Sequence, residues 1–124
     1  MNKLAVVVTT PPYSNLTATA IDYVETALQQ GITVIGVFFY QDGALHANKN
    51  IHIASDEYQV IKQWERLHNE YQLPLNLCIT AAEKRGIICD ESENKNNNFN
   101  DSFTISGLGE LVELSSNATR LVQF

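Results

Sequence analysis

Leu4-Ala5-Val6-Val7-Val8-Thr9 is a continuous run of apolar and β-branched residues near the start of the chain. Such a run predicts a strand that is buried on both faces, because no position within it is left polar for solvent. Pro11-Pro12 ends the run. Strands buried on both faces belong to parallel sheets that are covered by helices on each side. This one stretch therefore predicts an α/β fold.

The rest of the chain repeats the same alternation of strand and helix. Further strands are expected over residues 32–40, 74–78 and 121–124, and helices over 16–30, 55–71, 81–85 and 106–117. Ser55 is expected to cap the second helix, with Asp56 and Glu57 in its first turn. A loop is expected over 41–55, and a solvated, Asn-rich loop over 90–101. The prediction is one three-layer α/β/α domain over residues 1–124 with a mainly parallel, flavodoxin/Rossmann-like sheet.

Composition limits the partners and the compartment. The 124 residues carry 14 acids against 8 bases, a net charge of −6. Because phosphate contacts dominate nucleic-acid affinity and no basic stripe exists, direct binding of RNA or DNA is not expected. No stretch approaches transmembrane length, and the N-terminal apolar run is too short for a signal peptide. A reduced, cytoplasmic environment is the expectation, and no membrane contact is predicted.

Cys78 is the main candidate for covalent chemistry. It lies in Leu75-Asn76-Leu77-Cys78-Ile79-Thr80-Ala81-Ala82, where an expected strand gives way to an expected helix. A helix start presents unpaired N–H groups and partial positive charge, which favour the reactive thiolate. The carboxyl ends of parallel strands also gather functional groups, including here Tyr40 with Asp42 and the 9–14 loop. The alternative is a small core residue, and pattern alone favours that alternative.

The other cysteine and the three histidines give weaker evidence of a functional site. Cys89 stands eleven positions from Cys78, which is neither a C-x-x-C pair nor a zinc pattern, and its acidic neighbours disfavour a thiolate. His46 and His52 are expected in a surface loop, although a Cys–His pair would activate a thiol. His68 is expected on the solvent side of its helix. No metal-ligand spacing and no phosphate-binding motif occurs, so no cofactor or metal is predicted and a flavin-binding role is rejected.

Several short pieces, in order and spacing, carry a family resemblance. They are Val6-Val7-Val8-Thr9 with Tyr13, Val37-Phe38-Phe39-Tyr40 with Asp42-Gly43 and Ala47-Asn48, Ser55-Asp56-Glu57 with Trp64, Leu77-Cys78 with Ala81-Ala82, Arg85-Gly86, Phe103-Thr104 with Ser106-Gly107-Leu108-Gly109, and Arg120-Leu121-Val122-Gln123-Phe124. Together they span nearly the whole chain. The chain resembles the DsrE-like family, and within it the subunits of the TusBCD sulfur-relay complex.

The resemblance implies a sulfurtransferase in which Cys78 carries a persulfide. It implies a TusA-type sulfur donor, a TusE-type acceptor, and 2-thiouridine at the wobble position of certain tRNAs as the product of the pathway. The implied assembly is a dimer of heterotrimers with TusB-like and TusC-like subunits. The Asn-rich 90–101 region departs from the family pattern, and there partner docking is expected to differ.

Two other functions remain open. One is a DsrE-like subunit of dissimilatory sulfur oxidation that uses the same thiol with another acceptor. The other is a non-catalytic assembly subunit in which Cys78 only packs. In that case Cys78→Ser leaves thiolation in cells intact.

Overall fold

A five-stranded sheet with helices on both faces organises the chain. The computed structural model describes residues 2–89 and 98–124. Its strands are β1 (Lys3–Val8), β2 (Thr33–Phe39), β3 (Leu75–Cys78), β4 (Thr104–Ser106) and β5 (Arg120–Gln123). They lie in the order β4-β3-β2-β1-β5, and every neighbouring pair is parallel. The predicted α/β class with a parallel sheet is confirmed.

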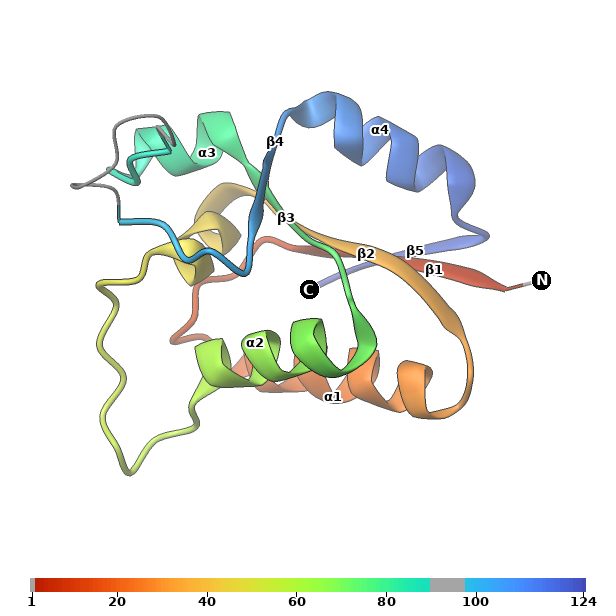
Figure 1. Cartoon of the computed structure of the whole chain (residues 1–124), viewed down its shortest axis with the longest axis horizontal. Coiled ribbons are helices and arrows are strands. Elements are labelled where there is room, and N and C mark those ends of the chain that lie inside the picture. The colour runs from red at the N-terminus through yellow and green to blue at the C-terminus, as the bar shows by residue number, and fades with distance from the viewer. Residues whose placement is uncertain (1, 90–97) are drawn as a thin grey trace.

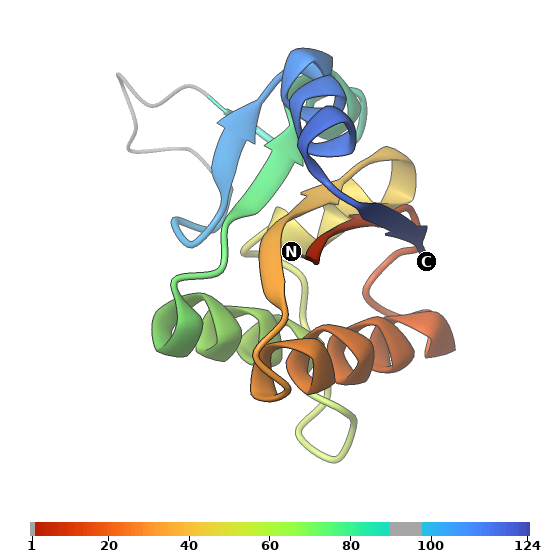
Figure 2. The same cartoon turned by 90° about the vertical axis from the view of Figure 1, so that its right-hand side faces the viewer.

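The helices form the two outer layers. They are α1 (Asn15–Gln29), η1 (a 3₁₀ helix, Gln41–Ala47), α2 (Val60–Tyr71), α3 (Ile79–Lys84) and α4 (Leu108–Asn117). Helices α1 and α2 cover one face, α4 covers the other, and α3 and η1 lie at the end of the sheet where the strands finish (Figure 1). Figure 2 shows the same layers from the side.

Most predicted elements form at the expected places, because their apolar patterns match what they bury. β1 is buried along almost its whole length. Helix α1 begins after Ser14, whose side chain accepts the N–H of Leu16. It buries Thr17, Ala20, Ile21, Val24 and Ala27. Helix α2 buries Val60, Trp64 and Leu67.

The expected start of the second helix is wrong. Ser55 does not cap α2, which begins at Val60, and neither Asp56 nor Glu57 lies in its first turn. Instead the N–H of Glu57 donates to the carbonyl of Ala54, which closes a turn before the helix. Tyr58, which the expected helix over 55–71 would include, lies outside α2 and is exposed. A local turn takes the residues that would otherwise serve as the cap.

The region after α3 holds two further differences. β4 was not predicted, and it becomes a strand through pairing with β3. Of the predicted solvated loop, residues 90–97 lie outside the described residues. In the remainder Phe99 is buried, and the backbones of Asn98 and Asn100 bond to Lys49 and Ala47. The end of that segment therefore packs against the end of η1 and the chain after it, contrary to the prediction of a wholly solvated loop.

Candidate functional site

Cys78 lies at the junction that the sequence predicts. It is the last residue of β3 and the N-cap of α3, with extended backbone (φ −68°, ψ 115°) and no side-chain capping hydrogen bond. Its partner across the sheet is Ser106, the last residue of β4. The first-turn N–H groups of α3 therefore have no side-chain cap from this position, and such groups favour negative charge.

The Cys78 side chain is nevertheless buried, with only 1% of its surface exposed in the isolated chain. The position at the rim agrees with the prediction, whereas the expected accessibility is not met. A thiol that exchanges sulfur with other proteins must be reached by their sulfur atoms. Access to Cys78 therefore requires the surrounding elements to move.

Strand alternation identifies the layer into which Cys78 projects. A Cβ atom added at Gly36 would lie 3.1 Å from the Leu114 side chain of α4 and 3.2 Å from Nδ2 of Asn76. Asn76 therefore faces α4, and Cys78, two residues further along β3, points to the same side. Ser106 Oγ lies 3.4 Å from Asn76 Oδ1 on this face. The thiol thus belongs to the layer of α4, on the far side of the sheet from α1 and α2.

His46 is not the surface histidine that was expected. It is fully buried in η1, where Nε2 lies 3.0 Å from the carbonyl oxygen of Thr10 and Nδ1 accepts a hydrogen bond of 3.2 Å from Trp64 Nε1. Because a carbonyl only accepts, Nε2 carries the proton and the ring is neutral. Burial lowers the pKa of His46 to about 4.

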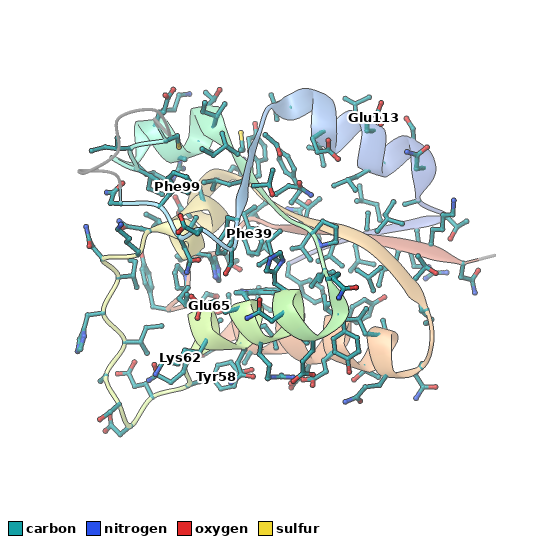
Figure 3. All side chains as sticks on the ribbon, viewed as in Figure 1. Phe39, Tyr58, Lys62, Glu65, Phe99 and Glu113 are labelled. Atoms are coloured by element: carbon teal, nitrogen blue, oxygen red, sulfur yellow. The ribbon has the colours of Figure 1, made fainter. Side chains whose placement is uncertain are left out.

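Both ring nitrogens of His46 are therefore engaged, and neither is available to activate Cys78. The ring also packs against Phe39, with centroids 5.3 Å apart. Figure 3 shows Phe39 inside the molecule between the sheet and α2. The histidine is part of an aromatic core. A sequence signal for this role is the run Phe38-Phe39-Tyr40, which places large rings directly before η1.

The remaining candidate residues from the sequence are His52, His68 and Cys89. His52 is exposed, whereas His68 is half-buried and its Nδ1 lies 2.8 Å from the carbonyl of Leu73, contrary to the expected solvent-facing position. Cys89 is buried, its sulfur lies 3.8 Å from the carbonyl of Ile87, and no disulfide joins it to Cys78. Residues 2–89 and 98–124 contain no group of three or more side chains arranged to hold a metal ion.

An ion pair that the sequence analysis did not anticipate joins η1 to the end of α3. Arg85 Nη2 lies 3.0 Å from Asp42 Oδ1, and Nε donates to the same oxygen. Nη1 of Arg85 also donates to the carbonyl of Ala81 within α3. The two residues are 43 positions apart, so only the fold brings them together. Of the expected rim residues, Asp42 is therefore linked to the end of the helix that follows Cys78.

Across the part of the chain that the structure describes, no helix has the length and apolar character needed to cross a bilayer.

Comparison with known proteins places the chain in a family. The model of the DsrE/DsrF-like family matches residues 2–124. Sulfurtransferase TusD of Salmonella arizonae is 36% identical over 127 residues, covering 98% of this chain and 99% of that protein. Sulfurtransferase TusD of Salmonella paratyphi B is 38% identical over 128 residues, with the same coverage.

A solved structure supports the same fold. The crystal structure of the YchN protein from E. coli aligns over 100% of both chains with a TM-score of 0.80 at 20% identity. This structure confirms the predicted architecture. The full-length relatives confirm the predicted sulfurtransferase class. The chain belongs to the DsrE/DsrF-like family.

Proposed function

We propose that this chain carries sulfur as a persulfide on Cys78 within a multi-subunit sulfur relay. In this proposal a TusA-type protein supplies the sulfur and a TusE-type protein accepts it, for 2-thiouridine formation at the tRNA wobble position. TusB-like and TusC-like subunits complete a dimer of heterotrimers in the cytoplasm. The observation that carries the proposal is the position of Cys78 at the start of α3, in a chain 36–38% identical to TusD sulfurtransferases.

The chemistry needs one thiol and no change in oxidation state overall. The Cys78 thiolate attacks the terminal sulfur of the donor's persulfide, a new S–S bond forms, and the donor leaves as a thiolate. The acceptor's thiolate then attacks the terminal sulfur on Cys78, and the Cys78 thiolate is released. Backbone N–H groups at the start of α3 favour the anionic sulfur between these two steps.

The charge of the chain supports a relay between proteins. A net charge of −6 disfavours contact with the phosphates of tRNA. The acidic chain is therefore assigned to carrying sulfur, and contact with the tRNA is assigned to a later protein of the relay. Buried cysteines without a mutual disulfide also suit a reducing compartment.

A second candidate function is favoured by one observation, the 1% exposure of Cys78. In this alternative the chain is an assembly subunit and the thiol is a packing residue. The dissimilatory variant of the relay uses the same Cys78 and differs only in the acceptor protein.

The deciding experiment measures persulfide on the intact chain in complex with its partner subunits. After incubation with a cysteine desulfurase, cysteine and the TusA-type donor, we expect the chain to gain one sulfur atom on the peptide that contains Cys78. A reducing agent should remove it. Adding the TusE-type acceptor should transfer that sulfur, whereas a sulfite-reductase-linked acceptor should receive it in the dissimilatory alternative.

Two variants make the result specific. Cys78→Ser should abolish the added sulfur and the 2-thiouridine in cells, whereas Cys89→Ser should retain both. The relay proposal is wrong if the sulfur maps to Cys89 or never appears. It is also wrong if cells with Cys78→Ser thiolate tRNA normally, and that outcome would establish the packing role.

A further inference from the structure

Ser106 is the polar residue that the sheet places directly beside Cys78. The two residues end the neighbouring parallel strands β4 and β3, and they are partners across those strands. Strand partners project to the same face of a sheet, and adjacent strands lie about 4.8 Å apart. Each of the two side chains carries its polar atom directly on Cβ. Rotation about χ1 alone can therefore bring the hydroxyl oxygen and the sulfur within hydrogen-bond reach.

The hydroxyl of Ser106 lies between two distant acceptors. Its Oγ is 3.4 Å from Oδ1 of Asn76 and 3.4 Å from the carbonyl oxygen of Thr104. A good O–H···O hydrogen bond measures about 2.7–2.8 Å, so both of these contacts are weak. A serine hydroxyl has one proton and donates to one acceptor at a time. A stronger acceptor beside Ser106 would therefore receive that hydrogen bond instead.

A thiolate on Cys78 is such an acceptor. Hydrogen bonds to an ionised group are roughly twice as strong as bonds between neutral groups. Only 1% of Cys78 is exposed, so water has little access to its sulfur, and a buried charge without partners is costly. A neutral donor on the adjacent strand lowers that cost without adding a charge of its own.

Tyr40 lies on the opposite flank of Cys78. Phe38 is the strand partner of Asn76, so the two residues face the same side of the sheet, and Tyr40 follows Phe38 at a spacing of two with extended backbone. The rings of Phe38 and Tyr40 are 6.2 Å apart, in agreement with a shared face. The tyrosine hydroxyl lies at the far end of a ring, whereas the hydroxyl of Ser106 and the sulfur of Cys78 both adjoin Cβ. Ser106 is therefore the better placed donor.

Other ionisable side chains lie on the elements around the ends of β3 and β4, and Figure 3 labels one of them, Glu113 of α4. Among the described residues they are Tyr40, Asp42, His46, Glu83, Lys84, Arg85, Cys89, Glu110 and Glu113. Asp42 and Arg85 are paired with each other, and both ring nitrogens of His46 are bonded. All of these groups remain when Ser106 is replaced. Their influence on Cys78 is therefore common to the wild type and the Ser106 variants.

We propose that Ser106 donates a hydrogen bond to the thiolate of Cys78 and stabilises it. The hydroxyl turns from Asn76 and Thr104 to the sulfur when Cys78 ionises, and the serine keeps its proton throughout. In the relay this bond stabilises Cys78 both as the attacking thiolate and as the thiolate released to the acceptor. That use of the bond rests on the proposed function, whereas the bond itself does not.

The test measures the rate at which iodoacetamide alkylates Cys78 in the full chain as a function of pH, with the product mapped by peptide mass. The thiolate is the form that reacts, so the midpoint of the profile reports the ionisation of Cys78. We expect Ser106→Ala to move the midpoint upward by about one pH unit, the size of a lost hydrogen bond to a charged group.

A matched pair of variants isolates the hydroxyl from the shape of the side chain. Threonine and valine have nearly the same shape, but only threonine has a hydroxyl. Ser106→Thr should keep the wild-type midpoint, whereas Ser106→Val should shift it as far as Ser106→Ala does. A looser fold would raise the rate by the same factor at every pH, whereas loss of the donor moves the midpoint.

Two further variants serve as controls on the same side of the sheet. Ser115 of α4 is exposed, and its hydroxyl donates to the carbonyl of Val112 at 3.1 Å. Ser115→Ala should leave the midpoint of Cys78 unchanged. Tyr40→Phe removes the hydroxyl on the other flank and should also leave it unchanged.

The proposal is overturned if Ser106→Ala and Ser106→Val keep the wild-type midpoint, or if Ser106→Thr shifts it equally. It is also overturned if Tyr40→Phe or Ser115→Ala produces the same shift. Alkylation needs no sulfur donor, so this proposal and the relay fail separately. Sulfur loading with a midpoint insensitive to Ser106 would retain the relay alone, whereas a shifted midpoint in a chain that never gains sulfur would retain the hydrogen bond alone.

Discussion

The two faces of the sheet are packed in different ways. On the side of α1 and α2, Phe39 makes edge-to-face contacts with Trp64 and Phe103, at centroid distances of 5.2 Å and 4.9 Å. On the other side α4 buries only Leu114, and Val112 is 64% exposed. The thiol belongs to this second, thinly covered side. If Cys78 carries the proposed persulfide, the aromatic packing that stabilises the fold and the sulfur chemistry lie in opposite layers.

The largest test of this contrast compares one helix from each layer. Trp64→Ala removes the largest fully buried side chain, the ring contact with Phe39 and the hydrogen bond to His46. We expect it to lower the free energy of unfolding by about 3–5 kcal/mol in urea titrations. Val112→Ala on α4 should change it by less than about 0.5 kcal/mol. Equal effects from the two substitutions would contradict the division between the layers.

The second test uses pH, because His46 lies on the aromatic side. Its pKa is lowered to about 4 in the folded chain from the usual 6.5. Between these two pH values the unfolded chain binds a proton that the folded chain does not. The contribution of neutral His46 to the free energy of unfolding is therefore complete above pH 6.5 and is lost as the pH falls through 4. A shift of this size corresponds to roughly 3 kcal/mol.

Urea titrations at neutral and acidic pH measure this dependence. His46→Gln should be less sensitive to pH over that window than the wild type, whereas the exposed His52→Gln should keep the wild-type dependence. If His46→Gln loses stability with acid as steeply as the wild type, the buried imidazole does not govern the acid response.

The smallest test compares two glycines, Gly43 in the tightly packed η1 and Gly109 in the thinly packed α4. In Gly43→Ala the new methyl group would meet the backbone of β1 at 1.9 Å, which forces η1 to shift. Overpacking of this kind should cost about 1–3 kcal/mol. Gly109 lies in the first turn of α4, where an added Cβ atom meets nothing within 4 Å. Gly109→Ala should stabilise by up to about 1 kcal/mol through helix propensity. Thermal unfolding should show a lower melting temperature for Gly43→Ala and a higher one for Gly109→Ala than for the wild type.

The local sequence pattern correctly predicted those elements whose apolar residues are the ones that the fold buries. The valine run of β1 and the stripe containing Trp64 and Leu67 specify their structures from within a few residues. β4 has three residues, too few for a periodic signal, and it is a strand because β3 lies beside it. Ser55 has the residue type of a helix cap but lies inside a turn that ends at Glu57, before α2 begins at Val60.

The sequence by itself determined the parallel α/β class and the position of Cys78 between strand and helix, because both follow from short-range alternation of apolar and small residues. Only the tertiary structure decided that the thiol is sealed, that His46 joins Trp64, and that Asp42 reaches Arg85. These contacts join residues far apart in the chain. Burial and charge pairing depend on which surfaces the folded sheet brings together.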